Sequence, residues 1–167
     1  MIKVIDGDLF DSTARFIVHQ VNCQGKMGSG VALQVKQKFP HVFEEYKKVC
    51  SSNMLGEIQI VSTNPEEVGM PVGSIFLPRS RQFIVNAFAQ DKYGYDGKMY
   101  TSLDALQSCF NKIHACIHEK NNNNNATIAM PYKIGCCRGG ADWNIVYQMI
   151  DETFSDHNVE LWRFDKG

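Results

Sequence analysis

The sequence predicts an α/β protein with three layers, α/β/α, in which helices cover both faces of a mixed, largely parallel central sheet. Two observations support this fold class. Short segments rich in β-branched residues alternate with longer amphipathic segments, a pattern that favours crossover connections and parallel pairing. In addition, two of the expected strands run into glycine-rich loops that open helices. The 167 residues show no internal repeat and no linker, so we expect one domain spanning residues 1–167.

The expected strands are short runs of β-branched and apolar residues bounded by polar or glycine-bearing turns. They lie at residues 2–5, 15–21, 57–61, 74–77, 82–88, 126–130 and 159–164. The run at 82–88 is almost entirely apolar, which is typical of a strand buried on both faces. We therefore place it in the middle of the sheet.

The expected helices show apolar residues at intervals of three and four. The first opens at Gly30 and meets Pro40, which ends it or resets it into a second helical stripe. A third helix opens near Thr101, and a fourth follows Asp142. The asparagine run at 121–125 cannot pack, so it predicts an exposed turn.

Composition argues against several functional classes. Formal net charge is −1 with both signs interspersed, so the sequence offers no basic patch for broad nucleic-acid binding. No run approaches the ~20 apolar residues that span a bilayer, and we expect a cytoplasmic monomer without membrane association. The six cysteines lack C-x-x-C pairs and zinc-ligand spacing. Reduced thiols, no metal and no organic cofactor are therefore expected.

Two loops share one architecture, in which an apolar strand leads into a glycine-rich loop and then into a helix. They occupy residues 21–30 and 130–143. Glycines permit positive φ and close approach of the backbone to a ligand, and N–H groups at a helix start favour phosphate. Such loops gather at the carboxyl ends of strands in open α/β sheets. The pair predicts a diphosphate site, although the first loop matches neither the dinucleotide nor the P-loop fingerprint. The alternative is that both loops are only tight connections.

Three stretches carry a resemblance to a known family. They are residues 7–10 (Gly-Asp-Leu-Phe), 18–32 and 134–143, and they stand in family order across essentially the whole chain. The chain resembles a macro domain, from the branch that contains terminal ADP-ribose protein glycohydrolases and ADP-ribose 1″-phosphate phosphatases. The resemblance implies a macro fold that binds ADP-ribose or an ADP-ribosylated molecule. It also implies hydrolysis of a phosphate, an acyl group or a protein or nucleic-acid linkage at the distal ribose.

The same resemblance implies a set of ligand-binding residues. Asp8 matches the aspartate that accepts a hydrogen bond from the adenine amino group, and the alternative for Asp8 is a turn former after Gly7. Asn22 matches an asparagine that contacts the distal ribose, whose hydroxyls need both a donor and an acceptor. The remaining positions are Leu9, Gln20, Gln24, Gly25, Met27, Gly28, Ser29, Gly30, Val31, Gly135, Cys136, Cys137, Arg138, Gly139 and Gly140.

The catalytic candidates implied by the resemblance are His19, Asn22, Lys92 and Asp142. His19 matches a histidine of the phosphatase members and would act as a general acid or base. The alternative for His19 is a half-buried strand histidine with a satisfied hydrogen bond.

The glycohydrolase members place a lysine nucleophile after the strand that here ends near Ala89, and an aspartate in the second loop. This sequence carries Gln90 and Gly139 at those places. Lys92 and Asp142 are the nearest residues of the required types, but a solvated charge and a helix N-cap explain them equally. These departures favour an alternative function, a non-catalytic reader of ADP-ribosylated partners. A nucleic-acid-binding module is a second alternative, against which the near-neutral charge argues.

Overall fold

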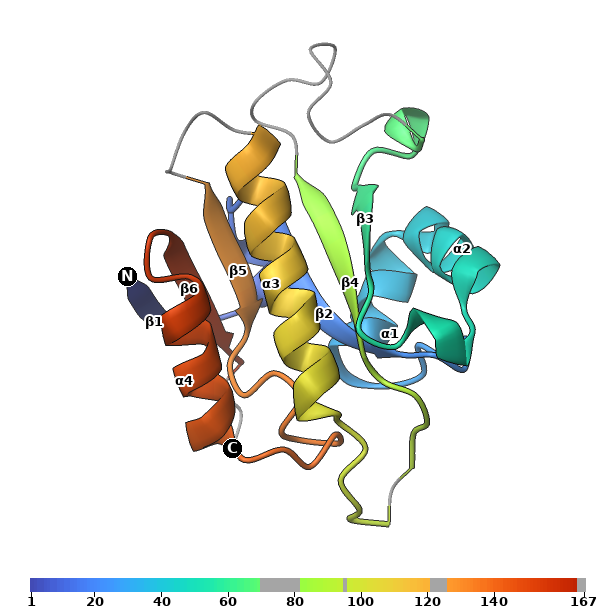
Figure 1. Cartoon of the computed structure of the whole chain (residues 1–167). Coiled ribbons are helices and arrows are strands. Elements are labelled where there is room, and N and C mark those ends of the chain that lie inside the picture. Colours follow the sequence, from blue (N-terminus) through green and yellow to red (C-terminus); the bar gives the residue numbers. More distant parts are fainter. Residues whose placement is uncertain (70–81, 95, 121–125, 165–167) are drawn as a thin grey trace.

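The computed structural model describes residues 1–69, 82–94, 96–120 and 126–164, and it contains a six-stranded sheet in the order β1-β6-β5-β2-β4-β3 (Figure 1). The strands are β1 (Ile2–Asp6), β2 (Phe16–Asn22), β3 (Ile58–Ser62), β4 (Phe83–Gln90), β5 (Thr127–Pro131) and β6 (Asn158–Arg163). Neighbouring strands pair in parallel except β3, which is antiparallel to β4. The predicted mixed, largely parallel sheet is therefore confirmed.

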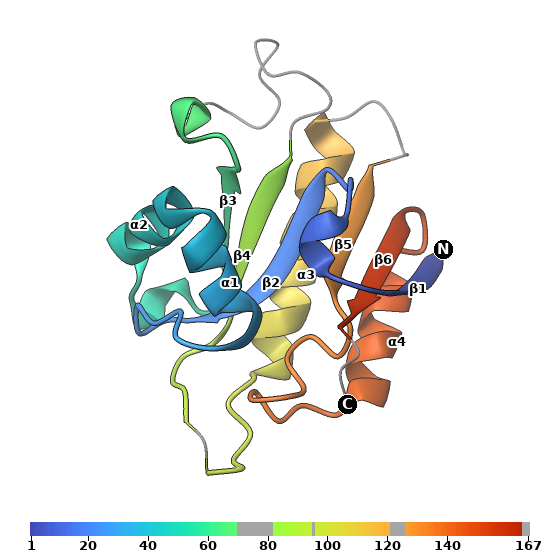
Figure 2. The same ribbon diagram turned by 180° about the vertical axis from the view of Figure 1, so that it is seen from behind.

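Helices cover both faces of this sheet. They are α1 (Gly30–Lys38), α2 (Pro40–Val49), α3 (Leu103–Lys120) and α4 (Trp143–Thr153). Figure 1 shows α3 and α4 in front of the sheet, and the view from behind in Figure 2 shows α1 and α2 on the other face. Within the described residues, no helix is both long enough and apolar enough to cross a membrane.

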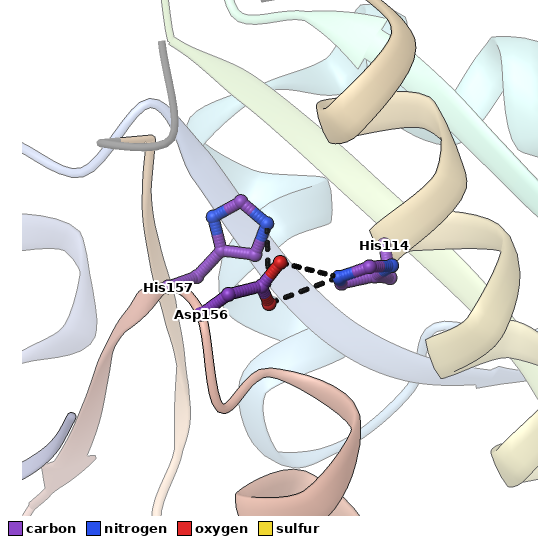
Figure 3. A group of neighbouring side chains, drawn as sticks. All are labelled: His114, Asp156 and His157. Carbon is purple, nitrogen blue, oxygen red and sulfur yellow. Dashed lines mark hydrogen bonds and ion pairs between the residues drawn. The ribbon is translucent and has the colours of Figure 1, made fainter.

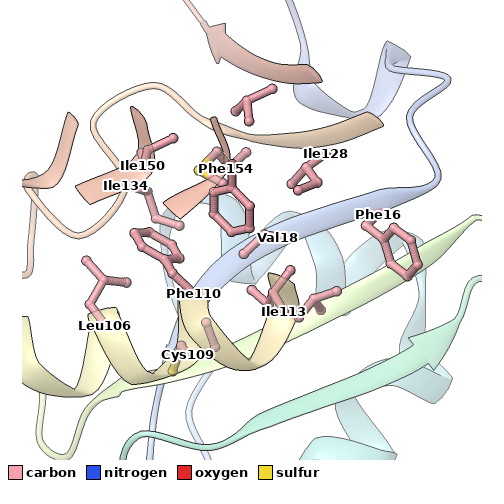
Figure 4. Packing of buried hydrophobic residues seen from close by; sticks show 14 of the residues in the cluster. Phe16, Val18, Leu106, Cys109, Phe110, Ile113, Ile128, Ile134, Ile150 and Phe154 are labelled. Carbon is pink, nitrogen blue, oxygen red and sulfur yellow. The ribbon is translucent and has the colours of Figure 1, made fainter. Parts of the chain in front are cut away.

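Alternation along β2 divides the buried side chains into two cores. Phe16 and Val18 pack with the apolar residues of α3 and α4, whereas Ile17 and Val21 pack with those of α1 and α2. In the first core, Phe110 of α3 and Phe154, directly after α4, pack with ring centroids 5.7 Å apart (Figure 4). Burial of both faces explains why β4 is apolar over nearly its whole length.

Six of the seven predicted strands agree with the structure to within two residues at each end. The seventh, at 74–77, and the predicted turn at 121–125 lie outside the described residues. The helix predicted near Thr101 is α3, which begins two residues later at Leu103, and it is Ser102 Oγ that accepts a hydrogen bond from Ala105 N–H (3.1 Å). Thr101 instead pairs with Gln90 in an isolated bridge, and its hydroxyl serves the second glycine-rich loop.

Candidate ligand-binding site

A cavity of about 720 Å³ opens at the carboxyl ends of the parallel strands. The first glycine-rich loop contributes residues 28–30 and the second contributes Gly135, Cys137, Arg138 and Gly139. The remaining lining residues named from the sequence are Asp8, Leu9, His19, Gln20, Asn22 and Val31. The structure thus brings both loops to one cavity, which is the arrangement that a diphosphate between them requires.

The side chain of Asn22 organises the first loop. Its Oδ1 accepts hydrogen bonds from Gln24 N–H (3.0 Å) and from the Tyr46 hydroxyl (2.9 Å), and its Nδ2 donates to Lys26 O (2.9 Å). Tyr46 is buried in the core beneath the loop and stacks on Phe88. Asn22 therefore sets the shape of the loop, and its amide group is already engaged there.

Asp91 fixes the outer side of this loop. Its carbonyl accepts from Cys23 N–H (3.0 Å), and its carboxylate accepts from Gln24 Nε2 (3.2 Å) and Ser52 Oγ (2.9 Å). Three predicted ligand-binding residues of the loop, Gln24, Gly25 and Met27, do not line the cavity. Met27 belongs to the core that packs on α1 and α2.

The second loop is held by Thr101. The Thr101 hydroxyl donates to Gly135 O (2.8 Å), and the backbone N–H groups of Tyr100 and Thr101 both donate to Gly139 O (2.8 and 3.0 Å). A Cβ atom at Gly139 would overlap Thr101 Oγ1 and lie 2.5 Å from Gly135 O. This packing requires glycine at position 139, so the aspartate of the glycohydrolase members has no room here. Cys136 and Gly140, also predicted to bind ligand, do not line the cavity.

A chain of amides determines which nitrogen of His19 carries the proton. Gln59 Nε2 donates to Glu45 O (2.9 Å), and a carbonyl only accepts, so Gln59 Oε1 faces Asn86. Asn86 Nδ2 donates to that oxygen (3.0 Å), which turns Asn86 Oδ1 toward His19 Nε2 (2.6 Å). His19 Nε2 must therefore donate, and Nδ1 is an acceptor.

His19 and Asn86 are buried, with exposed fractions of 1% and 0%. Burial lowers the pKa of His19 from 6.5 to about 4, although the hydrogen bond with Asn86 acts in the opposite direction. The imidazole is thus neutral near pH 7. Within the described residues, its Nδ1 has no hydrogen-bond partner.

A second amide chain, on the opposite face of β2, ends at Gln20. Because the Thr101 hydroxyl donates to Gly135 O, its oxygen accepts from Gln20 Nε2 (2.8 Å). Gln90 Nε2 donates to Lys92 O (2.9 Å), so Gln90 Oε1 likewise accepts from Gln20 Nε2 (2.6 Å). Gln20 Oε1 is left as a buried acceptor with no partner in the part of the chain that the structure describes.

The structure does not bring the other two catalytic candidates into the cavity. Lys92 is exposed and does not line it, and its carbonyl accepts the bond from Gln90. Asp142 is the N-cap of α4, where its side chain accepts from Asn144 N–H (2.8 Å). Asp8 does line the cavity, while its Oδ1 also accepts from Phe10 N–H (3.0 Å).

Sequence reasoning missed several cavity residues at the ends of β5 and β6. Tyr132, Trp162 and Arg163 line the cavity from this side. The Trp162 ring packs on Gly7, where an added Cβ would lie 3.2 Å from it, and its indole N–H donates to Glu160 (2.9 Å). Their position in the sequence could have predicted them, because each stands at or just beyond the carboxyl end of a parallel strand, and the cavity lies at this edge of the sheet.

The family model named Macro domain matches residues 18–150, about four fifths of the chain. The chain belongs to the macro domain family. The resemblance seen in the sequence motifs is thus confirmed. A macrodomain of Mycobacterium tuberculosis DarG has the same fold, with a TM-score of 0.74, 26% identity and 99% of each chain covered.

Two curated relatives of this macro domain carry named activities. A DNA ADP-ribosyl glycohydrolase of Mycobacterium tuberculosis is 28% identical over 157 residues, which cover 92% of this chain and 39% of that protein. An ADP-ribose 1″-phosphate phosphatase of Aspergillus clavatus is 38% identical over 65 residues, covering 38% of this chain and 32% of that protein. The chain spans about two fifths of the length of the glycohydrolase relatives.

Proposed function

We propose that this macro domain binds ADP-ribose in the cavity and hydrolyses a bond at the distal ribose, releasing an ADP-ribosyl group from its acceptor. The observation that carries the proposal is the pair of buried acceptors, His19 Nδ1 and Gln20 Oε1, on adjacent cavity-lining residues. A buried acceptor without a donor is costly, and the hydroxyl groups of a sugar supply donors. The two glycine-rich loops lining the same cavity suit the diphosphate that joins sugar and adenosine.

In this proposal, Asp8 receives the adenine and His19 receives a ribose hydroxyl. Asp8 lines the cavity, and its Oδ1 already caps Phe10 N–H, which fixes the direction of the carboxylate. His19 stays neutral near pH 7, so it acts as a hydrogen-bond acceptor that orients the sugar. Asn22 acts by shaping the first loop around the diphosphate. A lysine nucleophile has no place in this arrangement, because Gln90 stands in the cavity where the related hydrolases carry lysine.

DNA is the acceptor that we propose, because the relatives that match over nearly the whole chain are DNA ADP-ribosyl glycohydrolases. Net charge of −1 argues against extended backbone binding. Recognition of one modified nucleotide needs no such surface, since the ADP-ribosyl group itself occupies the cavity.

Substrate turnover tests the proposal directly. The panel is ADP-ribosylated single-stranded DNA, mono-ADP-ribosylated protein, ADP-ribose 1″-phosphate and O-acetyl-ADP-ribose, assayed with wild type and with His19→Ala. We expect wild type to release ADP-ribose from DNA at least tenfold faster than the variant. Equal rates on all four substrates would favour the second candidate function, a non-catalytic reader, which the uncharged Gln90 and Gly139 positions support.

Calorimetry with ADP-ribose tests the adenine assignment separately. Asp8→Asn keeps a good N-cap for Phe10 but replaces one carboxylate oxygen with a donor. We expect affinity to fall about tenfold, equivalent to ~1.4 kcal/mol. The matched control is Asp11→Asn, which changes an exposed acid of the same turn and should leave affinity unchanged. An Asp8→Asn variant that binds as tightly as wild type would remove adenine from this end of the cavity.

A further inference from the structure

A second cluster of polar side chains lies away from the cavity, toward the amino ends of the parallel strands. His114 projects from α3, and Asp156 and His157 come from the turn between α4 and β6 (Figure 3). His114 Nε2 lies 2.9 Å from Asp156 Oδ1 and 3.1 Å from Oδ2, and His157 Nε2 lies 3.7 Å from Oδ1. One potential ligand atom from each residue falls within 4.8 Å of the other two.

The core and the sheet hold this cluster in place. His157 N–H donates to Phe154 O (3.0 Å). Two residues later, Val159 N–H donates to the carbonyl of Met1, which directly precedes β1 (2.9 Å). The Phe154 ring packs against His114, with ring centroids 6.3 Å apart. The His157 side chain is 1% exposed, whereas those of His114 and Asp156 are 30% and 43% exposed. One potential ligand is therefore fixed, and the other two have room to adjust.

We propose that His114, Asp156 and His157 form a binding site for a divalent transition metal such as Zn²⁺. Two imidazole nitrogens and one carboxylate oxygen are a ligand set that Zn²⁺ and its neighbours accept, with water completing the coordination. Bonds of ~2.1 Å in a tetrahedron separate neighbouring ligand atoms by ~3.4 Å. The two nitrogen–oxygen distances to Asp156 Oδ1, 2.9 and 3.7 Å, lie on either side of that value.

The geometry also differs from that of a simple ion pair. A single histidine–carboxylate pair is complete once one imidazole meets the carboxylate, as His114 does. Here the second imidazole reaches the same oxygen from another element, so three ligand atoms surround one point. A bound cation would take the place of the hydrogen bond between His114 and Asp156, and both imidazoles would bind it through a deprotonated nitrogen.

The consequence of this site is structural. The metal would add a link between α3 and the turn between α4 and β6, which already meet through Phe110 and Phe154 and through His114 and Asp156. Binding to the folded state alone raises stability in proportion to the logarithm of the free metal concentration. None of the three residues lines the cavity, so the site is independent of the proposed function.

Titration of the metal-stripped chain with ZnCl₂ tests the proposal, read by calorimetry and by thermal unfolding. We expect saturable binding and a rise in melting temperature, with affinity at least tenfold weaker in His114→Ala and in Asp156→Ala. Both substitutions fall at partly exposed positions, so the fold should persist. His41→Ala is the matched control, because His41 contacts Ser62 O on another part of the molecule and should leave Zn²⁺ affinity unchanged.

The six cysteines, none of which is in a disulfide, could also bind zinc, and Co²⁺ distinguishes thiolate ligands from the cluster. Cobalt held by nitrogen and oxygen shows visible d–d bands without thiolate charge-transfer absorption. Zn²⁺ affinities of His114→Ala and Asp156→Ala equal to wild type, or thiolate absorption with Co²⁺, would overturn the proposal. Turnover of ADP-ribosyl substrates is a separate readout, so failure of one proposal is distinguishable from failure of the other.

Discussion

The two faces of β2 each carry an amide chain, and the two chains differ in how they are built. On the α1 and α2 face, strands alone connect His19 through Asn86 and Gln59 to a helix carbonyl. On the α3 face, Gln20 is held by Thr101 and Gln90, which depend on the second glycine-rich loop and on the loop after β4. Both amide chains start at backbone carbonyls, and each ends on a cavity-lining residue with an acceptor that has no partner among the described residues.

This difference means that the two acceptors should respond to different perturbations. The Gln20 acceptor cannot titrate, but it depends on loop packing. The His19 acceptor has a rigid support and is instead sensitive to protonation. Substitutions that perturb one amide chain and spare the other therefore separate their contributions.

Substitution of Gly139 should disrupt the amide chain that holds Gln20 more severely than any other change. In Gly139→Ala, the new Cβ overlaps Thr101 Oγ1 and approaches Gly135 O. The contact between Thr101 and the second glycine-rich loop must therefore open. We expect a loss of about 4 kcal/mol in the free energy of unfolding, at the upper end for overpacking. Urea denaturation measures it. Gly28→Ala is the control, because no atom of the described residues other than its chain neighbours lies within 4 Å of its added Cβ, and a similar loss there would contradict this expectation.

Acidification should act through the His19 chain. The pKa of His19 is about 4 in the folded chain against an ordinary value of 6.5, so between these pH values the unfolded chain binds a proton that the folded chain does not. Stability from this group is therefore complete above pH 6.5 and is lost as pH falls toward 4, by about 3 kcal/mol in total. Denaturant unfolding of wild type and His19→Gln across this range measures the effect as the difference in slope. Parallel slopes would show that His19 does not resist protonation.

Substitution of Asn86 should allow His19 to adopt either neutral tautomer while leaving the glycine-rich loops intact. Asn86→Leu deletes the oxygen that accepts from Nε2–H, so the imidazole gains freedom to carry its proton on Nδ1. Nitrogen-15 spectra of the imidazole should show only the Nε2–H form in wild type and both forms in the variant. We expect ADP-ribose affinity to fall about tenfold, or ~1.4 kcal/mol. A wild-type spectrum of the Nδ1–H form would refute the amide-chain argument.

Sequence patterns predicted the sheet, the helices and both glycine-rich loops, because hydrophobic periodicity and glycine placement are local signals. The resemblance to the macro family implied that Asp8, His19 and Asn22 belong to the ligand site, and all three line the cavity. Neither predicted that the Asn22 side chain is engaged by Gln24 and Lys26 of its own loop, or that it also accepts from the Tyr46 hydroxyl of α2, which is 24 residues away in the sequence. Thr101 was misassigned for the same reason, because its partner Gly135 is distant in sequence.

Substitution of Lys92 should change turnover least, and it tests whether a lysine takes part in the proposed reaction. Its side chain is exposed and outside the cavity, and only its backbone carbonyl supports the Gln20 chain by accepting from Gln90. Lys92→Ala retains that carbonyl, so we expect turnover of ADP-ribosylated DNA to stay within about twofold of wild type, a change below ~0.5 kcal/mol. Gln90→Leu, which removes the amide itself, should cost more. A hundredfold loss in Lys92→Ala would restore a lysine nucleophile and require the loop after β4 to rearrange when substrate binds.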